Sequence, residues 1–140
     1  MTLEAAKFLP LTVDAARRLG ARPLLAQAVR TDRAAAACWT ALLAGCGSAA
    51  RRELAPQLRR LSEATSMQVG SRWWFAEGAG HRRRVAGAQE NLEEAIADGD
   101  GQEFALAFVG YDHAMASAVV CAHSANPANR PARKVGERPA

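Results

Sequence analysis

The fold is decided by residues 100–123, which read DGQEFALAFVGYDHAMASAVVCAH. Asp100 and Glu103 have the D-x-x-E spacing of a capping box, so we expect a helix to begin here and to run to about His123. Its apolar residues form two stripes at helical spacing: Phe104, Phe108, Tyr111, Met115 and Val119 in one, and Leu106, Val109 and Val120 in the other. A helix that is apolar on more than one side is typically central in a bundle or buried at an interface.

The N-terminal part of the chain divides into short helical segments at proline and glycine. Residues 3–9 could form a helix that Thr2 caps and that Pro10 ends or kinks. The helical pattern resumes over residues 11–19 and stops at Gly20, which can adopt a left-handed conformation.

A longer helix follows, for which Pro23 suits the first position. Its apolar stripe is predicted from residues spaced by three and four: Leu25, Val29, Asp32, Ala36, Trp39, Leu43 and Cys46. The run Gly-Cys-Gly-Ser at residues 45–48 breaks this helix and offers Ser48 as the next N-cap.

The middle of the chain is interrupted by another proline and by several glycines. Pro56 argues against a single helix from residue 49 onward, so we expect a turn and then a fresh helix that begins near Pro56. The buried stripe of that helix is predicted to comprise Leu54, Leu58, Leu61 and Thr65. A break is expected near residues 77–80, although the pattern leaves open whether residues 56–98 form one kinked helix or two. Val85, Ala88, Leu92, Ala95 and Ile96 then mark a further helical face, which ends at the turn at residues 98–101.

These segments predict an all-α fold, a bundle of four or five helices, because the sequence shows neither strand-like alternation nor an internal repeat. We expect residues 1–124 to form a single domain. Residues 125–140 hold three prolines and five charged groups without periodicity, which predicts a flexible basic tail.

Charge is distributed unevenly along the 140 residues. The net charge of +4 divides into +3 over residues 1–47, +5 over residues 48–88, −7 over residues 89–124 and +3 over residues 125–140. A basic segment beside an acidic one favours segments that pair within the fold or across a dimer over a uniformly basic nucleic-acid binder.

Composition also suggests where the protein works. Cys38, Cys46 and Cys121 are odd in number and lack CxxC spacing, which indicates a reducing cytoplasm, with Cys38 and Cys121 in apolar helical patterns. Thirty-three alanines, and 16 arginines against two lysines, suit a bacterial protein from a GC-rich genome. The N-terminus does not resemble a signal peptide, and residues 34–47, taken as the least polar stretch, are too short to span a bilayer. We therefore expect a cytoplasmic protein with no membrane partner.

Tyr111, Asp112 and His113 place polar groups in the most apolar helix, where buried polar groups need partners. His113 could be a general base or a metal ligand, and the three residues could form the centre of a small enzyme or ligand-binding bundle. Successive helical residues point about 100° apart, so Asp112 and His113 cannot form one dyad without help from other helices. The alternative is structural, with His113 satisfied by a carbonyl or carboxylate.

No metal or cofactor site is predicted. The chain lacks the E-x-x-H pairs of di-iron bundles, and the candidate ligands do not share helical spacing: His81, His113, His123, Glu90, Glu93 and Glu94. Aligning the turn at residues 98–101 with a calcium loop places Ile96 and Ala107 at ligand positions. Nucleophile–histidine, Walker and dinucleotide-binding patterns in their required context are also missing from the sequence.

A second cluster joins aromatic residues to dense positive charge. It comprises Arg72, Trp73, Trp74, Phe75, His81, Arg82, Arg83 and Arg84. Arg72 and Arg82–Arg84 could bind phosphates while the rings stack on bases, as in a surface for RNA or single-stranded DNA. Alternatively, Trp73, Trp74 and Phe75 form a protein interface or enter the core, and the arginines pair with Glu90, Glu93 and Glu94 or remain solvated.

Asp32 is the one acidic residue in the stripe of residues 25–46. A buried carboxylate there could fix helix register or pair with an arginine. We favour the simpler interpretation that Asp32 lies at the edge of the stripe.

The sequence thus favours a small, non-enzymatic helical protein that acts through protein–protein interaction or self-association, with a regulatory role as one option. Trp73, Trp74, Phe75 and the last helix are its interface candidates. A nucleic-acid-associated regulator that uses the arginine cluster is the first alternative. A helical enzyme or ligand-binding bundle around Tyr111, Asp112 and His113 is the second.

Overall fold

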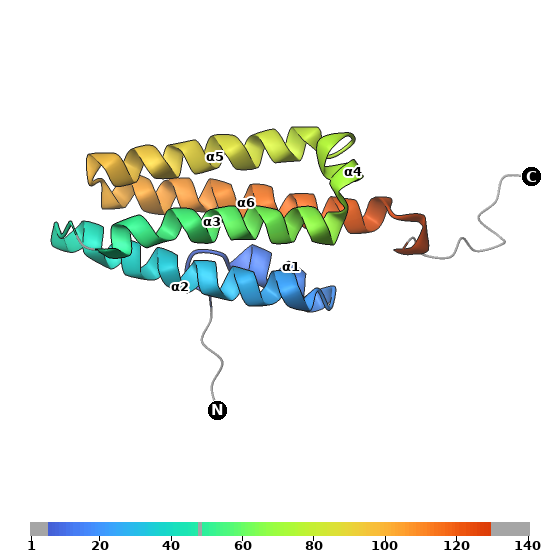
Figure 1. Cartoon of the computed structure of the whole chain (residues 1–140), viewed down its shortest axis with the longest axis horizontal. Helices are drawn as coiled ribbons and strands as arrows, with labels where there is room; N and C mark the ends of the chain where they lie inside the picture. Colours follow the sequence, from blue (N-terminus) through green and yellow to red (C-terminus); the bar gives the residue numbers. More distant parts are fainter. Residues whose placement is uncertain (1–5, 48, 130–140) are drawn as a thin grey trace, which may run out of the picture.

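A computed structural model describes residues 6–47 and 49–129, and every regular element in these ranges is helical (Figure 1). The elements are, in chain order, α1 (Pro10–Arg18), α2 (Arg22–Ala44), α3 (Ala49–Val69), α4 (Ser71–Phe75), α5 (Ala79–Asp98), α6 (Gly101–Ala125) and a 3-10 turn (Pro127–Asn129). The predicted all-α bundle is confirmed.

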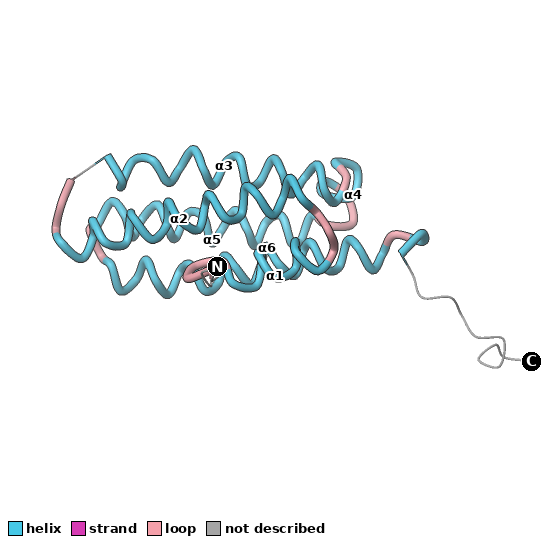
Figure 2. Tube along the Cα trace, turned by 90° about the horizontal axis from the view of Figure 1, so that it is seen from below, coloured by secondary structure: helices cyan, strands magenta, loops and turns pink. Residues whose placement is uncertain are grey.

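The helix α6 occupies the centre of the fold. The long helices α2, α3, α5 and α6 lie along the molecule, and the short α1 lies beside α2 and α6 (Figures 1 and 2). α6 contacts α1, α2, α3 and α5. The first apolar stripe predicted for it is buried throughout, with Phe104, Phe108, Tyr111, Met115 and Val119 at most 1% exposed. The rings of Phe8, Phe104, Phe108 and Tyr111 meet edge to face, with neighbouring centroids 5.2–5.8 Å apart.

Helix boundaries follow the predicted turn residues. The carboxylate of Asp100 accepts a hydrogen bond from the backbone N–H of Glu103 at 3.0 Å and so caps α6. α2 ends at Gly45 and α5 at Gly99, with φ of 71° and 68°, a left-handed conformation that costs glycine little because it has no Cβ. The breaks expected at residues 45–48 and 98–101 are therefore confirmed.

Pro56 lies inside α3, so the prediction that a fresh helix begins near it is wrong. A proline in a helix interior costs about 3 kcal/mol, because it lacks an N–H and crowds the preceding turn. Leu54 and Leu58 on either side of it are fully buried, as is Leu61. Burying each leucine contributes about 1.5–3 kcal/mol, which is enough to hold the helix together across the proline.

The buried face of α2 differs from the predicted one. Leu24, Ala28, Ala35 and Leu42 enter the core, each one residue before a member of the predicted stripe, whereas Leu43 is 60% exposed. Alanine fills positions 34–37, so the adjacent faces of α2 are about equally apolar there and hydrophobic periodicity does not distinguish them.

The remaining boundary predictions have mixed outcomes. Residues 6–9 of the helix expected at residues 3–9 are not helical, whereas residues 125–129, expected in the tail, complete α6 and form the 3-10 turn. The expected break at residues 77–80 is a turn at residues 76–78, which separates α4 from α5. The proposed caps Thr2 and Ser48, and residues 130–140 of the tail, lie outside the described residues.

Candidate functional site

Asp112 holds the N-terminal end of α1 from its position on α6. Its carboxylate accepts hydrogen bonds from the backbone N–H groups of Leu11 at 3.0 Å and Thr12 at 2.9 Å. The hydroxyl of Thr12 donates to the same carboxylate at 2.7 Å. The first N–H groups of a helix have no partner within the helix, and the positive end of the helix dipole favours an anion there. The carboxylate oxygens of Asp112 therefore already accept hydrogen bonds from α1, which gives the residue a structural role.

Asp32 plays a matching part from α2. Its carboxylate accepts from the backbone N–H groups of Phe8 at 2.7 Å, Leu9 at 2.9 Å and Lys7 at 3.3 Å. The residue is buried, so its interpretation as the edge of the α2 stripe is wrong. We call Asp32 and Asp112 the α1 clamp. The signal for it was a single aspartate within each apolar helix, but no local pattern points to partners so far away in the chain.

Tyr111 and His113, the neighbours of Asp112, point elsewhere. Tyr111 is fully buried, and its hydroxyl makes no hydrogen bond of normal geometry within residues 6–47 and 49–129. Burial raises the pKa of Tyr111, while the Ser62 hydroxyl opposes this shift. His113 is exposed. The structure thus separates the three residues into a core position, a structural anchor and a surface position.

His113 lies among exposed apolar residues on α6. Leu106 is 59% exposed, Val109 69% and Val120 49%, so the second apolar stripe of α6 reaches the surface. Leu106, Val109, His113, Ser117 and Val120 recur at spacings of three and four, which places them along one side of the helix. We call these five residues the α6 face.

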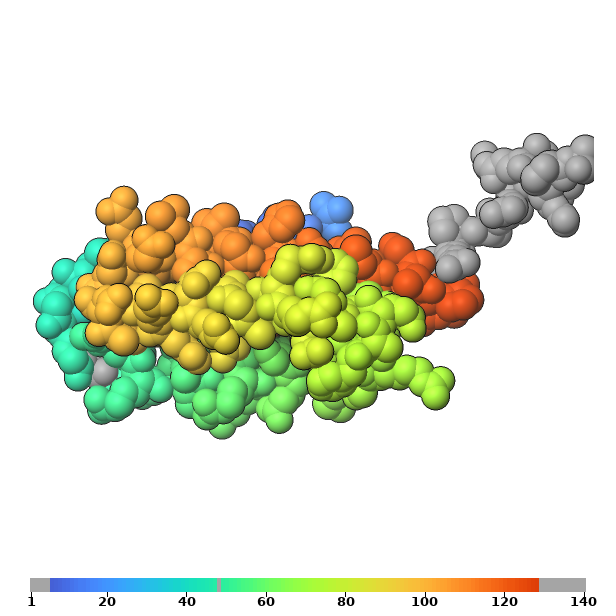
Figure 3. All heavy atoms as spheres, turned by 90° about the horizontal axis from the view of Figure 1, so that it is seen from above, coloured from blue at the N-terminus to red at the C-terminus, as the bar shows by residue number. Residues whose placement is uncertain are grey.

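Grooves run along both borders of the α6 face. On one side, residues of α1 and α6 line a cavity of about 510 Å³, with Leu11 48% exposed at its edge. On the other side, residues of α5 and α6, including Gly87 and His113, line a cavity of about 1030 Å³. In Figure 3 the orange surface of α6 lies between the yellow surface of α5 and the few visible blue atoms of α1. The face is therefore open but bordered by helices.

The aromatic and basic cluster forms a separate corner around α4. Trp74 is buried, whereas Phe75 is 63% exposed and lies under the Arg82 guanidinium, 4.9 Å from its carbon to the ring centroid. Trp73 is half-buried and stacks on His81, with centroids 5.8 Å apart. Of the three predicted interface residues, only Phe75 thus presents most of its surface to solvent.

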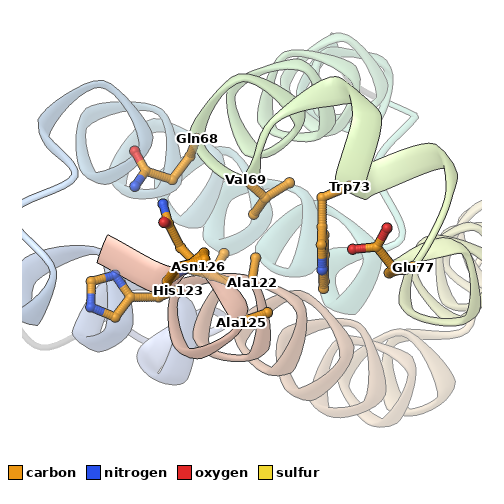
Figure 4. Close-up of a pocket in the computed structure, with 10 residues that line it drawn as sticks. Gln68, Val69, Trp73, Glu77, Ala122, His123, Ala125 and Asn126 are labelled. Carbon is orange, nitrogen blue, oxygen red and sulfur yellow. The ribbon is translucent and has the colours of Figure 1, made fainter. Parts of the chain in front are cut away.

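Trp73 also explains a glycine at this corner and borders a cavity. A Cβ at Gly78 would lie 2.4 Å from the Trp73 ring, so only glycine allows the indole to pack there. A cavity of about 340 Å³ lies between Trp73, Glu77 and the end of α6 (Figure 4). His123 and Gln68 lie at the border of this cavity. Among the residues that line it, Glu77 carries the one acidic side chain.

The arginines of the corner remain free of acidic partners. Arg72, Arg83 and Arg84 are exposed. Of the two alternatives for these arginines, pairing with Glu90, Glu93 and Glu94 does not occur in the ranges that the structure describes, and solvation fits. The ion pair found there is Arg18–Asp14 at 3.0 Å. Burial, and secondarily the charge of Arg84, lowers the pKa of His81.

The other predictions about sites concern metals and thiols. Within residues 6–47 and 49–129, no group of three histidine, cysteine, aspartate or glutamate residues is placed to hold a metal ion. All three cysteines are free. Cys38 is buried, and this burial raises its pKa against the opposing charge of Arg51. Cys121, although it lies in an apolar helical pattern, is exposed.

Among the described residues, one helix, α6, is long and apolar enough to be considered as a membrane span. By length and composition it could cross a membrane, with a mean hydropathy of 1.5 over 18 residues, and half of that window is buried in the bundle. The central helix of a water-exposed bundle passes the same test, so this finding is weak evidence for a membrane segment.

Comparisons of this chain with known protein families, with curated proteins and with solved structures find no match.

Proposed function

We propose that the protein is a non-enzymatic helical module that acts by binding a protein through the α6 face. The exposure of Leu106, Val109 and Val120 along one side of a single helix carries this proposal. Scattered apolar residues are normal on a protein surface, but an aligned set bordered by grooves is characteristic of helix-packing interfaces. The separation of Tyr111, Asp112 and His113 supports a binding role over a catalytic one, because no dyad forms among them.

A photo-crosslinking experiment in the producing cells tests the proposal. Benzoylphenylalanine is placed at Val109, and in a control chain at Arg60, which is exposed on α3. We expect ultraviolet light to produce covalent protein adducts of the chain modified at Val109 and none of the chain modified at Arg60. Equal labelling from both positions, or no adducts from Val109, contradicts the proposal.

A nucleic-acid-associated role is the second candidate, on the basis of one observation. Phe75 and three arginines, Arg72, Arg83 and Arg84, are exposed at the α4 corner without acidic partners among the described residues. Phosphate contacts make the logarithm of affinity fall steeply with the logarithm of salt concentration. Titration of labelled single-stranded RNA at two salt concentrations tests this role, and an absence of binding at low salt excludes it.

A further inference from the structure

The spacing of the α6 face is symmetric about His113, and both of its ends are apolar. Leu106 and Val120 each lie seven residues from His113, and Val109 and Ser117 each lie four residues from it. Reversing the direction of the helix about His113 therefore exchanges one large apolar residue for another at the ends of the face. A surface that matches itself when reversed is what a two-fold interface between identical chains requires.

The two halves of α5 carry opposite charges, basic before Gly87 and acidic after it. Arg84 and Glu90 lie three residues on either side of Gly87. Arg84, Glu90 and Glu93 are exposed. Gly87 and His113, the two centres, line the same groove between α5 and α6. Both patterns therefore have their centre at the same level of the bundle.

The glycines of this groove are not explained by the chain itself. Gly87 and Gly110 are exposed within α5 and α6, and a Cβ at either would meet no atom within 4 Å. A glycine in a helix interior costs roughly 0.5–1 kcal/mol relative to alanine. Such positions allow the close approach of another backbone, and no packing among the described residues requires them.

From these observations, and on the basis of the function proposed above, we infer that the partner of the α6 face is a second copy of this chain, bound antiparallel about a two-fold axis that passes beside His113 and Gly87. Leu106 then lies opposite the partner's Val120. Since α5 borders the same side of the face in both copies, α5 runs antiparallel to α5 of the second copy, and Arg84 lies opposite the partner's Glu90. Opposite charges thus meet twice across the axis, which sets the orientation of the pair.

Charge reversal tests this arrangement in the full-length protein. By size exclusion with light scattering, we expect the wild type to have twice the 14.9 kDa mass of one chain. Arg84→Glu and Glu90→Arg should each weaken dimerisation by at least about tenfold, because each brings like charges together at both symmetric contacts. An equimolar mixture of the two variants should restore the dimer, since both contacts then join opposite charges.

Failure of the mixture to restore the dimer overturns the antiparallel arrangement. The double variant Arg84→Glu/Glu90→Arg provides the matched control, because it exchanges the charges within one chain and should dimerise like the wild type. A double variant that remains monomeric also contradicts the inference.

Cysteine cross-linking fixes the register independently of charge. In a background with Cys46→Ser and Cys121→Ser, oxidation should link two chains that carry His113→Cys and two that carry both Val109→Cys and Ser117→Cys. Val109→Cys alone should not link, because positions 109 and 117 lie about 12 Å apart along a helix, beyond the reach of a disulfide. Efficient linking through Val109→Cys alone indicates parallel helices and overturns the inference.

Substitution of Gly110 gives a third test, because it should change the stability of the monomer and the affinity of the dimer in opposite directions. Gly110→Ala should raise the stability of the monomer by its better helix propensity and at the same time weaken the dimer by separating the helices. A variant that stabilises the monomer and leaves the dimer intact contradicts the close approach of the two backbones.

These outcomes separate the inference from the proposed function. A wild-type monomer that forms Val109 adducts with another protein overturns self-pairing and retains the binding role. A wild-type monomer without such adducts overturns both. A monomer that sediments with anionic phospholipid vesicles through an intact α6 face likewise overturns the second copy as the occupant.

Discussion

Asp112 of the α1 clamp and Val109 of the α6 face lie one turn apart on the same helix, yet they satisfy opposite physical demands. Asp112 is 3% exposed and accepts hydrogen bonds from Leu11 and Thr12, so a polar group is buried with its partners supplied. Val109, one turn away, is 69% exposed, so most of an apolar side chain remains uncovered by the residues that the structure describes.

This contrast shows that polarity alone does not identify a functional residue. The buried carboxylates look reactive in the sequence, but their lone pairs are occupied by backbone N–H groups, which leaves them structural. The apolar side chains look structural, but their exposure leaves free energy to be gained on association. What distinguishes the two regions is whether each group has a partner within the chain.

The largest effect is expected from breaking the clamp at Asp112. Asp112→Ala leaves the buried N–H and hydroxyl of Thr12 and the part-buried N–H of Leu11 without their carboxylate acceptor, so we expect the free energy of unfolding to fall by about 3 kcal/mol. Urea unfolding followed by circular dichroism measures it. Asp112→Asn keeps one acceptor oxygen and should lose less. A loss below about 1 kcal/mol for alanine would show that α1 is held mainly by apolar contacts.

A smaller loss is expected at Asp32. Asp32→Ala removes the acceptor of three backbone N–H groups, of which the one from Lys7 is long at 3.3 Å and part-buried, so we expect a loss of about 2 kcal/mol. Asp14→Ala is the matched control, because Asp14 is an exposed acid on α1 whose pair with Arg18 is worth at most about 1 kcal/mol. Equal losses for the two variants in urea unfolding would contradict a clamp at Asp32.

The smallest effect on stability is expected on the α6 face. Val109→Thr should change the unfolding free energy of the monomer by no more than about 0.5 kcal/mol, because the side chain is already in water. Val119→Thr places the same hydroxyl at a position that is 1% exposed and should cost about 1–3 kcal/mol. Both are measured in dilute protein, where association does not contribute. A similar cost at both positions would show that the α6 face is packed in solution.

Much of the fold follows from local chemistry in the sequence. Gly45, Gly99 and Asp100 mark helix boundaries because their conformational freedom and capping geometry act over a few residues. Pro56 misleads, since the packing of Leu54 and Leu58 outweighs a local cost that the sequence displays plainly. The orientation of α2 also depends on packing, because its alanines give no single apolar face.

The candidate site was predictable only in part. The exposed stripe of Leu106, Val109 and Val120 follows from its helical spacing, and the surplus of apolar residues on α6 already indicates a second contact surface. The role of Asp112 depends on residues 11 and 12, which lie 101 and 100 positions away, and no local pattern encodes that contact. The symmetry centres on α5 and α6 become meaningful only once one groove contains both.

The Asp112 contacts also set the order in which the chain can mature during synthesis. Leu11 and Thr12 are translated first among the residues of this contact, and their acceptor follows 100 or more residues later. At about 5–20 residues per second, the start of α1 waits roughly 5–20 s for Asp112 to be made. Until then, Asp32 is the one residue of the α1 clamp that has been made. The apolar side chains at the start of the growing chain must meanwhile avoid other pairings. The hydrogen bonds that hold the start of α1 are therefore completed only after Asp112 of α6 has been made.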